Sequence, residues 1–240
     1  MGASFYSYWG KATHDDVGEF HLLPYHCLDV AGVAECILNT QPHLMQSLRR
    51  RLATTDDGTV NLVRFFAALH DIGKFSDDFQ NLRPDLLKRL RNLTSRARCS
   101  IRHDALGLLA WREIAWPTIR ESGWLCQDDD DDPYRWRDDV LGTLAGAMAG
   151  HHGKPAEPSA DGCVARADLH FTAENRVAMK EFTCALISLH SDTETPLLQH
   201  GEDLAENARM ASWLMAGLLV LADWIESSVL PFSSGCHSVN

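Results

Sequence analysis

Histidine and aspartate residues recur through this sequence at positions where they could hold metal ions. An adjacent pair, His70 and Asp71, follows an almost wholly apolar stretch and precedes Ile-Gly-Lys. Imidazole nitrogen and carboxylate oxygen are good ligands for first-row divalent metals, and a carboxylate can bridge two ions through its two oxygens. The pair therefore suggests a centre with two metal ions and with Asp71 between them.

The His-Asp dipeptide alone is a weak signal, because His14-Asp15 and His103-Asp104 repeat it in the same chain. A single buried histidine is also more often a core residue than a metal ligand. Context favours His70, since His14 lies in a polar leader whereas His70 ends the most apolar stretch. Further inward-facing histidines and aspartates weaken the explanation that all of them are ordinary core residues.

Helices are expected to position these candidates. Apolar residues recur at helical spacing through most of the chain and alternating strand patterns are scarce, which predicts an all-α domain with loop insertions. Val60 to Leu69 should form a central helix that ends at His70-Asp71, with Gly73 as a stop signal. Five helical segments each direct ionisable side chains toward the core. In chain order these side chains are His26, His70, Asp71, His103, His151, His152 and Asp223.

Bulk properties exclude several classes of protein. The length of 240 residues favours one large domain, and the net charge of -11 argues against a broad basic surface for nucleic acid. Seven scattered cysteines without a CxxC pair fit a reducing cytoplasm. Met1 to Lys11 lacks the features of a signal peptide, and Trp213 to Ile225 is too short to span a bilayer. We therefore expect no membrane contact and a buried core helix at Trp213 to Ile225.

Several segments support no specific chemistry. Asp128 to Asp132 and Gly153 to Asp168 are expected to form solvated loops. The basic stretch Arg83 to Arg102 is more typical of a solvated helix face than of a DNA track, so DNA-contacting residues remain unidentified. His21 is expected to be a polar core or surface histidine, and Trp224 to pack beside the last helix.

Taken together, the motifs resemble the HD nuclease domain of the CRISPR-associated helicase-nuclease Cas3. The resemblance rests on the order of His26, His70-Asp71-Ile-Gly-Lys74, His103, Gly150-His151-His152-Gly153 and Leu-Ala-Asp223-Trp224. The strings Tyr8-Trp9-Gly10-Lys11 and His21-Leu-Leu-Pro-Tyr-His26 are similar to the type I-E branch. Almost the whole chain takes part, from about residue 6 to residue 230.

The resemblance implies a helical HD-superfamily fold with a central metal site. It implies a single nuclease domain over residues 1–240, with a leader at 1–20 and a tail or linker toward a possible helicase at 230–240. One metal would be held by His26, His70, Asp71 and Asp223, and the second by Asp71, His103, His151 and His152. Asp71 and Lys74 are the expected catalytic residues. The two ions would be Fe, Mn, Co or Ni, with Mg and Zn as alternatives.

The implied function is metal-dependent cleavage of DNA. Such a nuclease would nick and degrade single-stranded DNA exposed by a type I CRISPR surveillance complex (Cascade), together with a Cas3 helicase domain in cis or in trans. No G-x-x-x-x-G-K-[ST] phosphate loop occurs in the chain, so the chain itself should not be an ATP-driven motor.

Two alternatives remain open at this point. The same ligands fit an HD-type nucleotide phosphohydrolase. A non-catalytic docking domain could also retain the fold, although burying unpaired histidines and carboxylates without use is costly.

Overall fold

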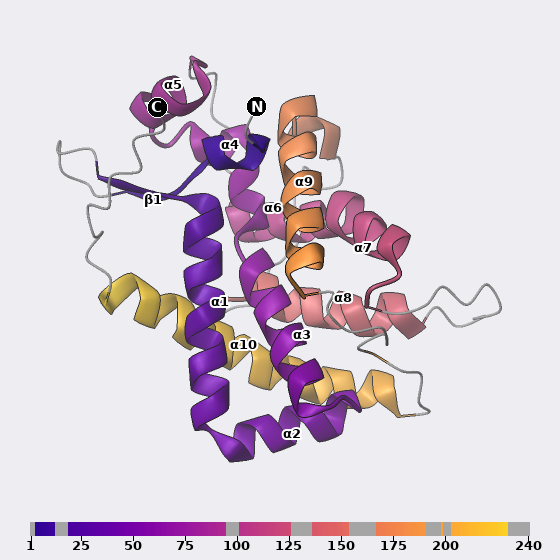
Figure 1. The fold of residues 1–240 in the computed structure, drawn as a ribbon. Coiled ribbons are helices and arrows are strands. Elements are labelled where there is room, and N and C mark those ends of the chain that lie inside the picture. Colours follow the sequence, from indigo (N-terminus) through magenta and orange to yellow (C-terminus); the bar gives the residue numbers. More distant parts are fainter. Residues whose placement is uncertain are drawn as a thin grey trace.

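The computed structural model describes residues 3–12, 19–94, 101–125, 136–153, 167–190, 198 and 203–229. Helices make up most of this part of the chain, and they surround a single apolar core (Figure 1). The predicted all-α class is confirmed. The predicted loop at Asp128 to Asp132 and most of that at Gly153 to Asp168 lie outside the described residues, as do His14 and Asp15.

The main helices are α1 (Leu23–Thr40), α2 (Pro42–Leu52), α3 (Asp56–Leu69), α4 (Asp77–Gln80), α5 (Pro84–Arg91), α6 (His103–Ala110), α7 (Trp116–Ser122), α8 (Trp136–Ala149), α9 (Ala173–His190) and α10 (Leu204–Val229). Short helical turns add η1 (Ser4–Ser7), η2 (Ile72–Phe75), η3 (Trp111–Ala115) and η5 (Ala167–Leu169). Two strands, β1 (Trp9–Ala12) and β2 (Phe20–Leu22), pair antiparallel.

The central helix α3 begins and ends as its sequence dictates. The Thr55 side chain caps its start by accepting a hydrogen bond from the Gly58 amide at 3.0 Å. Asp56 and Asp57 lie in the first turn, where carboxylates interact favourably with the helix dipole. The following apolar residues are buried against α1, α2, α8 and α9. His70 and Asp71 therefore leave α3 inside the protein, as predicted.

Gly73 has a different role from the predicted stop signal. Helix α3 already ends at Leu69, and Gly73 lies in the buried turn η2. A Cβ atom on Gly73 would lie 1.9 Å from the carbonyl oxygen of His103 and 2.6 Å from the Gly107 amide nitrogen. Glycine is required here because the backbones of η2 and α6 meet directly.

Helix α10 packs against α1, α2 and α8 and crosses the bundle in Figure 1. By length and composition alone it could cross a membrane, because its apolar span Leu204–Ser228 is longer than the stretch Trp213 to Ile225. Only one side of α10 is buried. Trp213 is 75% exposed and Trp224 is 66% exposed, which corrects the predictions of a buried core helix at Trp213 to Ile225 and of a packed Trp224.

The predicted leader contributes to the folded domain. Phe5, Tyr8 and Trp9 are buried, and β1 brings Gly10 against α1. A carboxamide on α4 holds this segment in place, since Gln80 Nε2 donates to the carbonyls of Trp9 and Lys74 at 3.0 and 2.8 Å. The hairpin thereby places Lys11 beside Asp223 and Glu226 of α10.

Candidate metal centre

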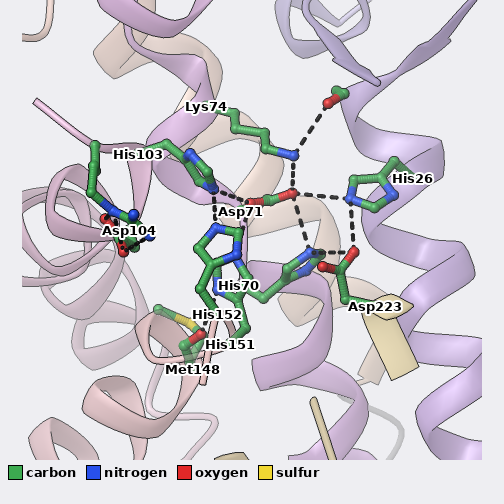
Figure 2. A network of polar contacts seen from close by, with 12 residues as sticks. His26, His70, Asp71, Lys74, His103, Asp104, Met148, His151, His152 and Asp223 are labelled. Atoms are coloured by element: carbon green, nitrogen blue, oxygen red, sulfur yellow. Dashed lines mark hydrogen bonds and ion pairs between the residues drawn. The ribbon is translucent and has the colours of Figure 1, made fainter. Parts of the chain in front are cut away.

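The six other candidate ligands gather around the carboxylate of Asp71 (Figure 2). They come from α1, the end of α3, the start of α6, the end of α8 and the C-terminal part of α10. His26, His70, Asp71 and His151 are buried, while His103 and Asp223 are partly exposed and His152 is exposed. In the other described His-Asp dipeptide, His103-Asp104, only the histidine faces Asp71. The Asp104 carboxylate instead pairs with the Arg102 guanidinium at 2.9 Å.

One set of side chains faces the Oδ2 atom of Asp71. The Nε2 atoms of His26 and His70 lie 2.9 and 3.2 Å from this oxygen. Both nitrogens also approach Oδ1 of Asp223, at 3.8 and 3.9 Å. The donor atoms of His26, His70 and Asp223 lie close enough together to hold one metal ion.

A second set faces the other oxygen of the same carboxylate. The Nε2 atoms of His103 and His151 each lie 3.4 Å from Oδ1 of Asp71. His152 joins them through its Nε2 atom, 2.9 Å from Nε2 of His103. The three histidines form another group with donor atoms at metal-binding spacing. The same two groups of residues are the ones that the family resemblance implies as ligands of two metals, and that assignment stays a prediction.

Hydrogen bonds to the backbone prepare two of these histidines as ligands. Nδ1 of His70 donates to the Ala67 carbonyl at 2.7 Å, and Nδ1 of His151 donates to the Met148 carbonyl at 3.0 Å. In the neutral imidazole this leaves a lone pair on Nε2, pointed at Asp71. Nε2 of His70 and Oδ1 of Asp71 are buried without a hydrogen bond. A divalent cation would satisfy both atoms, so the residues fit a metal centre.

The electrostatics agree with this arrangement. Burial lowers the pKa of His103 to about 4 and that of His151 to about 3, so both imidazoles stay neutral and can act as ligands. Burial opposes ionisation of Asp71, but Lys74 and His70 outweigh it and hold the Asp71 pKa well below its usual value. Burial also opposes protonation of His70, yet the Asp71 and Asp223 carboxylates raise its pKa. The carboxylates of Asp71 and Asp223 therefore favour a positive charge beside the His70 ring.

Lys74 is an internal residue rather than a surface lysine. It is 8% exposed, and its Nζ lies 2.5 Å from Oδ2 of Asp71. Nζ also donates to the Gly10 carbonyl at 3.2 Å and lies 5.2 Å from the centre of the Phe79 ring. These contacts fix a positive charge at the edge of the metal centre.

Two residues beside the centre were absent from the predicted set. The Lys11 ammonium contacts the carboxylate of Glu226 and lies 3.5 Å from Oδ1 of Asp223. Glu226 also approaches His26, and the pKa of Glu226 falls to about 2 because His26 and Lys11 outweigh its burial. A usable signal for Glu226 was present, since a second acid three positions after Asp223 shares its helix face.

The arrangement can be compared with known proteins. Residues 9–232 match the family model described as "Cas3, HD domain". This chain belongs to the Cas3 HD domain family. The "CRISPR-associated endonuclease/helicase Cas3" of Escherichia coli (strain K12) is 29% identical over 234 residues. The alignment covers 92% of this chain and 25% of that protein, so the chain spans about a quarter of the relative's length.

Solved structures show the same fold. The Thermus thermophilus Cas3 HD domain, solved in the presence of Ni²⁺, matches with a TM-score of 0.59 and 20% identity, covering 94% of this chain and 76% of that one. A chain in the structure titled "CRISPR RNA-guided surveillance complex, pre-nicking" matches with a TM-score of 0.61 and 21% identity, covering 92% and 24%. The predicted HD-superfamily fold of the Cas3 HD domain family is thereby confirmed.

Proposed function

We propose that this chain is a metal-dependent DNA nuclease that cuts single-stranded DNA by two-metal phosphodiester hydrolysis. The observation that carries the proposal is the single buried carboxylate of Asp71, with imidazole nitrogens facing each of its two oxygens. His26, His70, Asp71 and Asp223 would hold one ion, and Asp71, His103, His151 and His152 the other. Two such ions, when bound, activate water and stabilise the attacking and leaving oxygens.

The protein's own residues supply orientation and charge. Backbone carbonyls fix the rings of His70 and His151, and the ionised Asp71 lies between the two ligand sets. Lys74 supports Asp71 and lies close enough to the centre to neutralise charge that develops on a phosphate. The substrate would approach from the side of His103 and His152, because these are the more exposed histidines of the second set.

We further propose that the nuclease belongs to a type I CRISPR interference system in the cytoplasm. The relatives support this assignment, since one is an endonuclease/helicase and another structure is a surveillance complex. Residues 1–240 would act as one domain, with 230–240 leading toward a helicase in cis or meeting one in trans. Most DNA affinity would come from these partners, because the chain carries a net charge of -11.

Circular single-stranded DNA tests the proposal directly. Purified protein with Mn²⁺ or Ni²⁺ should linearise and shorten the circle, whereas Asp71→Ala should lose cleavage and keep its helical circular dichroism spectrum. Release of phosphate from nucleotides without cleavage of the circle would instead establish a nucleotide phosphohydrolase. Normal cleavage by Asp71→Ala would refute the proposed centre, and retained partner binding without wild-type cleavage would favour a docking domain.

A further inference from the structure

A buried carboxylate lies directly behind the candidate ligand His26. The Glu226 side chain is 2% exposed, and its Oε2 atom lies 3.2 Å from Nδ1 of His26. The same carboxylate contacts the Lys11 ammonium, and its Oε1 atom lies 3.8 Å from Nδ1 of His21. A buried carboxylate is costly unless it is paired, and these contacts offset the cost of burying Glu226.

His26 differs from His70 and His151, the other two buried histidines of the metal centre, in how its ring could be oriented. Nδ1 of His70 and Nδ1 of His151 each donate to a backbone carbonyl at the end of a helix. His26 lies within α1, where its buried Nδ1 makes no hydrogen bond and faces the Glu226 carboxylate at 3.2 Å. If Glu226 accepts the Nδ1 proton, the Nε2 lone pair is left pointing toward Asp71 and Asp223.

Lys11 lies between the carboxylate of Glu226 and that of the candidate ligand Asp223. Its ammonium contacts Glu226 and Ser227 and lies 3.5 Å from Oδ1 of Asp223. Donor atoms of His21, His26 and Glu226 also lie close enough to hold an ion of their own. The Lys11 ammonium already pairs with the Glu226 carboxylate, which favours a role for Glu226 in orienting His26 over a role in binding another metal ion.

We propose that Glu226 and Lys11 are positioning residues for the metal centre. Glu226 fixes the Nδ1-protonated tautomer of His26, and Lys11 holds Glu226 and Asp223 in place. Without Glu226, the single proton of the neutral His26 ring would stay on Nε2, where the hydrogen bond with Oδ2 of Asp71 at 2.9 Å already favours it. His26 would then be blocked as a ligand. The metal-binding part of this proposal rests on the proposed function.

Long-range ¹H–¹⁵N NMR of the metal-free protein tests the tautomer without reference to activity. In wild type, Nδ1 of His26 should carry a proton. In Glu226→Leu it should lose that proton while Nε2 becomes protonated. Glu226→Gln keeps an acceptor oxygen and should restore the protonated Nδ1. Glu206→Leu, at an exposed position of the same helix, is the matched control and should leave the His26 signals unchanged.

Calorimetric titration with Mn²⁺ tests the consequence for metal binding. Loss of an outer carboxylate typically weakens metal binding by about 10-fold to 100-fold, and we expect this for Glu226→Leu, with partial recovery in Glu226→Gln. Lys11→Met keeps the Glu226 carboxylate but removes the cation that holds it, and should also weaken binding, which provides a second variant if Glu226→Leu does not fold.

Two outcomes would overturn the inference. One is the same protonated nitrogen of His26 in wild type and Glu226→Leu, and the other is unchanged Mn²⁺ affinity in both Glu226→Leu and Lys11→Met. Wild-type protein that binds no metal would instead refute the proposed function, and the NMR comparison would still decide the role of Glu226.

Discussion

Substitution of Gly73 should damage the metal centre without touching a ligand. In Gly73→Ala the new Cβ would lie 1.9 Å from the His103 carbonyl oxygen, whereas real Cβ atoms stay at least 3.0 Å from such atoms. The turn η2 and helix α6 must therefore separate by about 1 Å. Because both neighbouring groups are backbone, no side-chain rotation can relieve the contact.

The energetic cost follows from this overpacking. Forcing extra atoms into a packed interior costs about 1–3 kcal/mol, which lowers the melting temperature of a chain of this size by about 2–12 °C. The separation also moves His103 relative to Asp71, since the two residues lie on opposite sides of the contact. A ligand displacement near 1 Å reduces turnover by about 100-fold and weakens metal binding.

Thermal unfolding and Mn²⁺ titration measure both effects in the same protein sample. The matched control is Gly142→Ala on α8, where a Cβ would meet no atom within 4 Å. Alanine in that helix should raise stability by about 0.5–1 kcal/mol and leave metal binding unchanged. A Gly73→Ala protein with the wild-type melting temperature and wild-type Mn²⁺ affinity would refute the close-contact argument.

Three further perturbations have defined outcomes. Burial lowers the pKa of His190, so unfolding takes up a proton and the free energy of unfolding falls as the pH drops below about 6.5. Urea titrations at about pH 5.5 and about pH 7.5 should show a smaller loss of stability at the lower pH for His190→Leu than for wild type, and an equal loss would contradict this. Phe65→Ala, at a fully buried position, should lower the free energy of unfolding by about 3–5 kcal/mol in urea; a cost below 1 kcal/mol would mean that the site is not packed as described. Ni²⁺ at about 100 times its dissociation constant should stabilise wild type by about 2.7 kcal/mol and Asp71→Ala by much less; equal shifts in melting temperature would exclude binding at this centre.

Helical periodicity carried most of the information about the candidate ligands. The apolar stripe of α1 and the apolar length of α3 determine which side chains point inward, and both patterns are local in the sequence. His26, His70 and Asp71 were therefore predictable before any tertiary contact was known.

The roles of Lys11 and Gly73, which sequence reasoning missed, depend on long-range contacts. Lys11 lies on a strand of four residues, too short to show a pattern, and its partner Glu226 is 215 positions away. The role of Gly73 depends on the approach of α6, which no local signal encodes. The exposure of Trp213 and Trp224 could not be predicted from periodicity, because α10 carries apolar residues on both its buried and its exposed sides.

The hairpin that brings Lys11 to α10 has a consequence for the order in which the protein can mature during synthesis. Lys11 and His26 leave the ribosome early, but their partners Asp223 and Glu226 emerge only after nearly the whole described chain has been made. Until then α1 and α8 also lack the helix against which they pack. A nascent or prematurely terminated chain therefore has an incomplete centre, and the proposed nuclease activity would be withheld until translation reaches the last helix.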